Sequence, residues 1–201
     1  MNIILGSSSP RRKSILGGLV RSFSIAHPSI VEIPRTGETP EAFSTRIAED
    51  KCRAIETNLY GREFPLLVIT ADTIVTIDGR VIGKPSDFED AVAMLMMLKG
   101  RTHRVITAVT LLAAENPEAP RTMMTGFEAT EVTFRDLDRD GVIRYLNTID
   151  YRDKAGSYAF QEQGSMIVEG FRGSATNIIG FPLRLFFSML ADQGIAGRVF
   201  S

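Results

Sequence analysis

Apolar runs rich in β-branched residues alternate along the chain with segments in which apolar residues recur at helical spacing. This alternation is typical of an α/β protein. The apolar runs predict strands over residues 2–6, 22–26, 66–70, 73–77, 80–82, 103–113, 127–135 and 166–171. Asp78-Gly79, which separates two of these runs, is typical of a hairpin turn.

Helix starts along the chain are marked by a capping residue or a proline. The longest expected helix follows Thr39-Pro40 and covers residues 40–59, because its apolar residues fall on one face. Ser86 and Glu89 have the spacing of a capping box and predict a helix over 87–98. Further helices are predicted from Ser9-Pro10 to Gly17-Gly18, over 139–147, and from Pro182 onwards.

Length and composition are those of an ordinary globular protein. With 201 residues, the chain is long enough for one large domain or two small ones. Apolar residues make up 44% and charged residues 23%, which allows a substantial core. The 23 basic and 24 acidic side chains give a formal net charge of −1. This balance argues against binding to duplex nucleic acid, whose phosphates must be neutralised, but it allows a small phosphate site.

Cysteine and histidine are too scarce for several kinds of site. The single cysteine, Cys52, excludes an internal disulfide and a thiolate zinc cluster. The two histidines, His27 and His103, are too few for a multi-histidine metal site. The longest apolar run, around 105–114, is too short to span a bilayer, and the N-terminus lacks the basic start of a signal peptide. We therefore expect a cytoplasmic protein without a membrane partner.

A cluster of serines and cations lies between the first strand and the first helix, as Ser7-Ser8-Ser9-Pro10-Arg11-Arg12-Lys13. Free N–H groups and the helix dipole favour an anion there, and guanidinium groups match the geometry of phosphate. Cations at a helix N-terminus oppose the dipole, so three in a row indicate a bound anion. The alternative is a capped helix with a solvated basic first turn. The pattern of a Walker loop is absent.

Two single residues are candidates for phosphate chemistry. Asp72 follows an apolar run, and a carboxylate at a strand end could hold a divalent metal or accept a proton from water. Lys84 lies between Gly83 and Pro85, where its ammonium could meet a phosphate. Taken alone, each is more simply explained as an aspartate in a turn and a lysine on the surface.

The segment from Asp153 to Tyr158, followed by Gln161, brings a carboxylate, an ammonium, a glycine and an amide together. The amide of Gln161 could read the edge of a base, since it carries both a donor and an acceptor. The alternative is an ordinary polar loop. Glu32 and Lys51 are further candidates, although each would normally be a solvated surface charge.

In this order, these segments resemble the motifs of the Maf family of nucleoside triphosphate pyrophosphatases. The family pattern has S-x-S-P-R-R after the first strand, an acidic residue after the next, a lysine on the following helix, and then A-D-T, G-x-x-x-G-K-P and D-K-A-G-x-Y-x-x-Q. The matching segments are Ser7 to Arg12, Glu32, Ala48 to Cys52, Ala71 to Thr73, Gly79 to Pro85, Asp153 to Gln161, and Gly173 to Leu183. The resemblance covers essentially the whole chain.

The resemblance implies one domain over residues 1–201. Its fold would be α/β, with an elongated mixed β-sheet flanked by helices and two lobes around a central cleft. The implied reaction is hydrolysis of a nucleoside triphosphate to the monophosphate and pyrophosphate, with Mg²⁺ or Mn²⁺ as cofactor. The resemblance also suggests a homodimer.

The same resemblance assigns roles to individual residues. Asp72 is the implied catalytic residue, and the sequence leaves open whether it acts as a base or as a metal ligand. The implied metal ligands are Glu32, Asp72 and Asp153. The implied substrate-binding residues are Ser7, Ser9, Arg11, Arg12, Lys51, Thr73, Lys84, Lys154 and Gln161.

Three of these positions separate the specificity groups of the family. Arg11, Thr73 and Gln161 look like the group that acts on dTTP, UTP and modified pyrimidine nucleotides. The group acting on 7-methyl-GTP tends to have tryptophan, glutamine and glutamate there. The chain departs from the family pattern at Gly6 and Cys52, which replace alanines, and beside Gln161, at Ala159-Phe160 and Glu162.

Two other functions compete with this hypothesis. The first is a nucleotide-binding regulator without turnover, because the family has been linked to septum formation. The second is a purine pyrophosphatase of the inosine-triphosphatase type, against which the S-x-S-P-R-R segment argues. Asp72, Lys84 and Asp153 are all present, which favours an enzyme.

Overall fold

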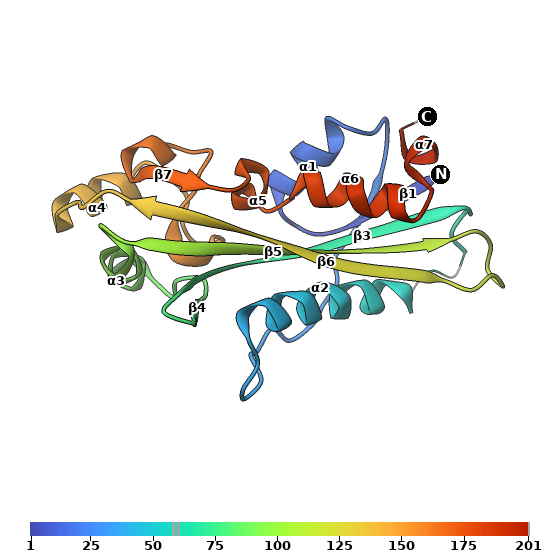
Figure 1. The fold of residues 1–201 in the computed structure, drawn as a ribbon, viewed down its shortest axis with the longest axis horizontal. Helices are drawn as coiled ribbons and strands as arrows, with labels where there is room; N and C mark the ends of the chain where they lie inside the picture. The colour runs from blue at the N-terminus through green and yellow to red at the C-terminus, as the bar shows by residue number, and fades with distance from the viewer. Residues whose placement is uncertain (58, 60, 201) are drawn as a thin grey trace. The chain divides into compact units, whose positions relative to one another are not determined.

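The chain forms a mixed α/β fold in the computed structural model, which describes residues 1–57, 59 and 61–200 (Figure 1). Within this part, seven strands form one sheet in the order β2-β1-β3-β5-β6-β7, and β4 pairs with β3. The strands are β1 (Asn2–Gly6), β2 (Ser24–Ala26), β3 (Leu66–Ile77), β4 (Arg80–Ile82), β5 (Thr102–Ala114), β6 (Thr122–Phe134) and β7 (Val168–Arg172). The prediction of a mixed sheet flanked by helices is confirmed.

Helices follow most strands in the chain. They are α1 (Pro10–Gly17), α2 (Pro40–Glu56), α3 (Phe88–Leu98), α4 (Arg139–Leu146), α5 (Ala175–Ile179), α6 (Leu183–Asp192) and α7 (Ala196–Val199), with two 3₁₀ turns, η1 (Ala155–Ser157) and η2 (Gly164–Met166). Within the described ranges, no helix has both the length and the apolar character needed to cross a membrane.

The chain divides into two compact units. Unit 1 comprises Met1–Asp72, Thr107–Glu128 and Gly180–Ser201, and unit 2 comprises Thr73–Ile106 and Ala129–Ile179. The long strands β3, β5 and β6 therefore contribute residues to both units. A central cleft and a single domain over 1–201 stay predictions.

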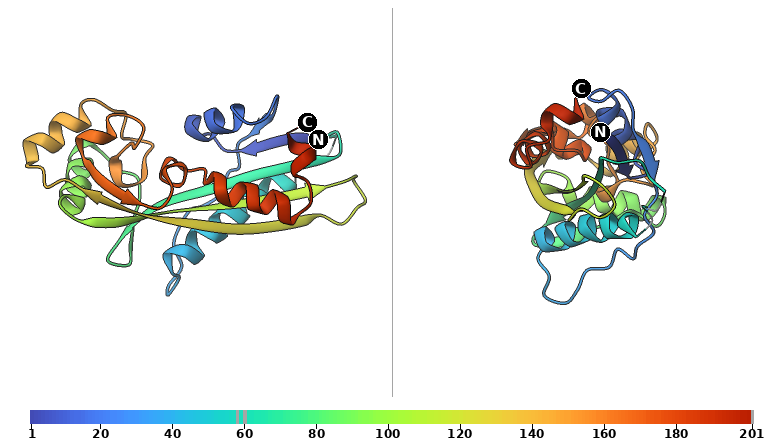
Figure 2. Two further views of the ribbon diagram at one scale, coloured as in Figure 1. Left: turned by 45° about the horizontal axis from the view of Figure 1, so that its top comes forward. Right: turned by 90° about the vertical axis from the view of Figure 1, so that its right-hand side faces the viewer.

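The core of unit 1 lies on both faces of its strands. β1 pairs in parallel with β2 and with β3. Because successive side chains of a strand point to opposite faces, Ile3 and Leu5 pack with residues of α1, α6 and α7, whereas Ile4 packs with Cys52 and Ile55 of α2. Figures 1 and 2 show α2 on the side of these strands opposite α6.

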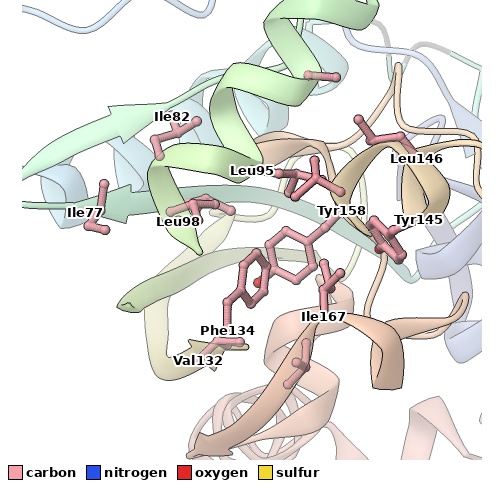
Figure 3. Close-up of a cluster of buried hydrophobic side chains, with 14 of the residues drawn as sticks. Ile77, Ile82, Leu95, Leu98, Val132, Phe134, Tyr145, Leu146, Tyr158 and Ile167 are labelled. Atoms are coloured by element: carbon pink, nitrogen blue, oxygen red, sulfur yellow. The ribbon is translucent and has the colours of Figure 1, made fainter. Parts of the chain in front are cut away.

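The core of unit 2 is built around aromatic rings. Figure 3 shows Phe134, Tyr158 and Tyr145 close together beneath α3, whose Leu95 and Leu98 point toward them. The rings of Phe134 and Tyr158 meet edge to face, with centroids 4.9 Å apart, a favoured aromatic arrangement.

Several predicted boundaries were wrong. The α2 helix ends at Glu56, with Thr57 as its C-cap, rather than at 59, and positions 58 and 60 lie outside the described residues. The cap of α3 is Asp87, not Ser86: its carboxylate accepts the N–H of Asp90 at 2.8 Å. Both errors have the same cause. An apolar stripe or a capping spacing in the sequence does not fix the residue at which a helix begins or ends.

Strand boundaries also differ from the prediction. The predicted extended runs 66–70 and 73–77 are both confirmed, and they belong to one strand, β3, which also includes Ala71 and Asp72. β6 begins at Thr122 rather than at 127, and its early part is joined to β5 by a hydrogen bond between the hydroxyls of Thr125 and Thr110 at 3.0 Å. The helices α5 and α7 were not predicted.

Candidate active site

The turn from Ser7 to Ser9, the predicted anion corner, joins β1 to α1 in unit 1. Ser9 is the N-cap of α1, and its hydroxyl accepts the N–H of Arg12. The hydroxyl of Ser7 accepts the N–H of Ser9 at 3.2 Å. Both serines therefore shape the turn, and the N-terminus of the helix follows directly.

The guanidinium of Arg12 holds this corner to other segments of unit 1. Its Nη1 donates to Ala71 O at 2.9 Å and to Ser7 Oγ at 3.2 Å, and its Nε donates to Gly180 O at 2.8 Å. Burial lowers the pKa of Arg12, while the charge of Asp72 opposes that shift. Arg12 is thus a fixed cation beside Ala71 in the middle of β3, with much of its hydrogen bonding directed to backbone carbonyls.

Glu32, Lys51 and Asp72 come together in unit 1 from three separate segments. The ammonium of Lys51 lies 2.8 Å from Asp72 Oδ1 and 2.9 Å from Glu32 Oε1. Asp72 and Lys51 are largely buried, with side chains 7% and 12% exposed, whereas Glu32 is 46% exposed. The two carboxylates therefore converge on a single cation position, which the ammonium occupies.

Two hydrogen bonds fix α2 against the middle of β3 and so place Lys51. Thr70 Oγ1 donates to Ala48 O at 2.7 Å, and Ser44 Oγ donates to Asp72 O at 3.2 Å. Both hydroxyls are fully buried. Sequence reasoning missed Ser44 and Thr70 as supports of the site; Thr70 directly precedes the A-D-T motif, but Ser44 has no signal of its own.

The donor set at this position fits a hard divalent cation. Carboxylate oxygens suit Mg²⁺ or Mn²⁺, and Mg²⁺ is often held by one or two carboxylates together with substrate phosphates. Throughout residues 1–57, 59 and 61–200 there is no cluster of three or more His, Cys, Asp or Glu side chains that could hold a metal alone. Glu32 and Asp72 would hold the ion, with the remaining ligands coming from the nucleotide and water.

In unit 2, the turn that carries Lys84 adjoins the loop after α4. Gly156 N–H donates to Gly83 O at 3.0 Å, so Lys84 and the D-K-A-G segment are neighbours. Gly156 has φ +68°, and a Cβ there would lie 3.1 Å from Val75 Cγ2, so only glycine fits this approach without strain. Lys84 itself is exposed.

The lysine of the D-K-A-G segment is buried rather than presented at the surface. Lys154 is 5% exposed, and its ammonium donates to Asp150 O and to Asp153 Oδ1, the latter at 3.0 Å. Glu162 Oε1 lies 3.7 Å from the same nitrogen. This arrangement makes Lys154 the centre of a local ion pair. A substrate contact for Lys154 and a metal contact for Asp153 stay predictions.

The three positions tied to base choice are divided between the units. Arg11 belongs to unit 1 and is half-buried, whereas Thr73 and Gln161 belong to unit 2, with Gln161 exposed. Their roles stay predictions.

Cys52 and His103 are both buried away from any chemistry assigned above. Burial raises the pKa of the Cys52 thiol to about 12, which fits the prediction that it is no nucleophile. His103 Nε2 shares a 3.0 Å hydrogen bond with the hydroxyl of Tyr158 inside the core of unit 2.

Comparison with known proteins gives a consistent result over nearly the whole chain. A family described as Maf-like protein matches residues 2–193. A dTTP/UTP pyrophosphatase of Thermococcus gammatolerans is 39% identical over 187 residues, covering 93% of this chain and 94% of the relative. Another, of Akkermansia muciniphila, is 40% identical over 193 residues, covering 96% of each chain. A third, of Clostridium acetobutylicum, is 32% identical over 204 residues, covering 97% of this chain and 99% of the relative.

Solved structures are more distant. The dITP/XTP pyrophosphatase of Mycobacterium abscessus has a TM-score of 0.38 and 14% identity, covering 98% of this chain and 97% of that one. The Ham1 protein of Staphylococcus aureus has a TM-score of 0.39 and 11% identity, covering 96% of this chain and 100% of that one.

Proposed function

Because the chain belongs to the Maf family, we propose that it hydrolyses dTTP and UTP to the nucleoside monophosphate and pyrophosphate. The observation that carries the proposal is the cluster in unit 1, where Lys51 joins the carboxylates of Glu32 and Asp72. This cluster supplies a fixed carboxylate beside a cation, as cleavage of a phosphoanhydride requires.

The cations of the site neutralise the triphosphate before attack. Three groups of unit 1 favour an anion. They are the N–H groups at the N-terminus of α1, the half-buried Arg12 and the ammonium of Lys51. The family resemblance implies a further substrate-binding cation, Lys84, which is exposed in unit 2. Charge neutralisation by fixed groups lowers the barrier because it costs no reorganisation during the reaction.

Asp72 orients the attacking water and accepts its proton. Its Oδ1 accepts the hydrogen bond from Lys51, which fixes the orientation of the carboxylate. We assign Oδ2 to the water: it orients the oxygen toward the α-phosphorus and accepts the proton that the water loses. A new bond forms between water oxygen and α-phosphorus, the bond from α-phosphorus to the bridging oxygen breaks, and pyrophosphate leaves with that oxygen.

Mg²⁺ or Mn²⁺ held by Glu32 and Asp72 would supply a Lewis acid that polarises the α-phosphate. Glu32 and Asp72 would be the protein ligands of the ion, and the ammonium of Lys51, which contacts both carboxylates, would remain a cation of the site.

A homodimer and a role in septum formation stay predictions from the family resemblance. A cytoplasmic location stays a prediction from the sequence, which shows no targeting or membrane segment. The relatives described as dTTP/UTP pyrophosphatases favour a pyrimidine substrate over the purine alternative.

The test is hydrolysis of UTP in ¹⁸O-labelled water with Mn²⁺, followed by mass spectrometry of the products. Attack at the α-phosphorus places the label in UMP and leaves pyrophosphate unlabelled. Label in pyrophosphate, or formation of UDP and inorganic phosphate, would overturn the assignment of the cleaved bond. Tight nucleotide binding without turnover of any pyrimidine or purine triphosphate would favour the regulator instead.

A further inference from the structure

The segment that carries Glu32 has little of its own to hold it in place. Residues 27–39 connect β2 to α2 without regular secondary structure. The apolar neighbours of Glu32 do not anchor it, since Val31 and Ile33 are 74% and 66% exposed. A carboxylate on such a loop needs another constraint if it is to meet Lys51 and Asp72 in one geometry.

Arg46 of α2 provides that constraint from the other side of the loop. Its Nη2 donates to Ile33 O at 3.0 Å, next to Glu32 in the chain. Its Nε donates to Glu38 Oε1 at 2.6 Å, and its Nη2 to Glu38 Oε2 at 2.8 Å. One guanidinium therefore holds the loop at two points, through a backbone carbonyl and a bidentate carboxylate pair.

The guanidinium is itself fixed on the helix. Its Nη1 lies 3.3 Å from Asp50 Oδ2, one helical turn further along, and its carbon lies 5.5 Å from the ring centroid of the buried Phe43. Hydrogen bonding to Arg46 lowers the pKa of Glu38 to about 2. The pair therefore remains charged throughout the pH range in which the enzyme would work.

The two attachments of the loop lie on one helix. Arg46 holds the backbone next to Glu32, and Lys51, further along α2, meets the carboxylate of Glu32. Since α2 is also tied to the middle of β3 by Ser44 and Thr70, the helix serves as the common frame for the whole cluster.

We propose that Arg46 is a positioning residue that holds Glu32 opposite Asp72 for the divalent cation. The inference rests on the proposed function, because it takes Glu32 as a ligand of that cation. Partners that orient a metal ligand typically affect metal affinity about 10–100-fold when they are replaced. Arg46→Gln should therefore weaken Mn²⁺ binding about 10-fold or more.

The experiment compares four variants with the wild type: Arg46→Gln, Arg46→Lys, Glu38→Gln and, as the control, Arg53→Gln. Arg53 is an exposed arginine of the same helix. Mn²⁺ binding is measured by electron paramagnetic resonance in the presence of α,β-methylene-UTP, which the enzyme cannot cleave at that bond. Hydrogen exchange of residues 30–38 is measured on the protein without metal or nucleotide.

Support for the proposal is weaker Mn²⁺ binding and faster loop exchange in Arg46→Gln and Glu38→Gln, with neither change in Arg53→Gln. Arg46→Lys should recover part of the binding, because it keeps the charge but loses the two-pronged contact. In the turnover assay, excess Mn²⁺ should raise the kcat of Arg46→Gln back to the wild-type value. The KM of this variant for UTP should not fall. Using two single variants keeps the test valid if one of them fails to fold.

Unchanged Mn²⁺ affinity in both Arg46→Gln and Glu38→Gln would overturn the proposal, whatever the loop exchange. Absence of Mn²⁺ binding by the wild type would overturn it as well. Wild-type protein that binds Mn²⁺ with the expected dependence on Arg46, but releases no pyrophosphate, would contradict the proposed function and leave the positioning role supported.

Discussion

Gly6, the last residue of β1, lies where a side chain has no room. A Cβ at this position would come within 2.3 Å of Ile55 Cδ1 and 2.6 Å of Thr70 Cγ2. Thr70 is one of the two residues that tie β3 to α2, so crowding here acts on the support of Lys51 and Asp72. Ile55 and Thr70 therefore fill the space that a side chain at Gly6 would need. The family resemblance leads us to expect alanine at this position.

Gly6→Ala should lower the free energy of unfolding by about 1–3 kcal/mol, as overpacking of a filled core does. Urea unfolding measures the change. The matched control is Gly17→Ala, where the nearest atom to an added Cβ, Phe23 Cε1, is 3.7 Å away and the substitution should be neutral or stabilising. Equal stability of the two variants would show that the space around Gly6 has been misjudged.

Among the elements, β5 contributes an unusual residue to the core of unit 2. His103 is 1% exposed and meets the rings of Phe134 and Tyr158 edge to face. Its Nε2 shares a hydrogen bond with Tyr158, while its Nδ1 has no hydrogen-bond partner among the described residues. Burial lowers the pKa of His103 to about 4, because the interior disfavours the charged ring.

This shift predicts a pH dependence of stability. In the unfolded chain the imidazole gains a proton below about pH 6.5, whereas in the fold it stays neutral down to about pH 4. The unfolded state therefore binds more protons between these values, and stability falls as the pH is lowered through this window. The loss between pH 7 and pH 4.5 should be about 2–3 kcal/mol from this group.

The measurement is urea unfolding at both pH values for wild type, His103→Gln and the exposed control His27→Gln. His103→Gln should lose less stability on acidification than wild type, because glutamine has no proton to gain. His27→Gln should behave like wild type. An identical loss in all three proteins would contradict the assignment to His103.

The sequence predicts most elements but few of their ends. The apolar stripe over Phe43, Ile47 and Ile55 correctly indicates α2, yet Leu59 continues the stripe after the helix has ended at Glu56. Leu59 is buried all the same, so burial alone does not distinguish a helix from the chain that follows it. α5 and α7 are only five and four residues long, too short to show a helical repeat of apolar positions. α7 has no side-chain cap, and α5 has a single one, the hydroxyl of Ser174, which accepts the N–H of Asn177 at 3.3 Å.

The residues of the candidate site could likewise be predicted only in part. Local patterns indicate the α1 corner, because capping and the helix dipole act within a few residues. Glu32 and Lys51 look like ordinary surface charges, and only the fold brings them to one point with Asp72. Arg46 has no motif at all, since its partners at Ile33 and Glu38 lie on a loop whose path the sequence does not reveal.

At the scale of the whole molecule, the family resemblance predicts that base choice depends on Arg11, Thr73 and Gln161. Of the three specificity positions, Arg11 lies in unit 1 and Thr73 and Gln161 lie in unit 2. A base preference that depends on all three residues should change fully only when all three are replaced.

The triple variant Arg11→Trp, Thr73→Gln, Gln161→Glu should shift the ratio of kcat/KM from UTP toward 7-methyl-GTP. Pyrophosphate release from both nucleotides measures this ratio, and circular dichroism checks that the variant is folded. Loss of UTP turnover alone is insufficient support, because misfolding also causes it. An unchanged ratio in the folded triple variant would show that these residues do not select the base.

Whether the protein is a pyrimidine nucleotide pyrophosphatase that depends on Asp72 is tested by pyrophosphate release from dTTP, UTP, dATP, GTP and ITP. The assay compares wild type, Asp72→Asn and the exposed control Asp192→Asn, each with Mn²⁺. Wild type should prefer dTTP and UTP in kcat/KM and lose turnover when the metal is removed with EDTA. Asp72→Asn should lose about 10²–10⁴ in kcat for the preferred nucleotides while still binding them, because the cations remain and only the carboxylate is lost. Preference for ITP would contradict a pyrimidine substrate, and near-normal kcat in a folded Asp72→Asn protein would contradict the catalytic role of Asp72.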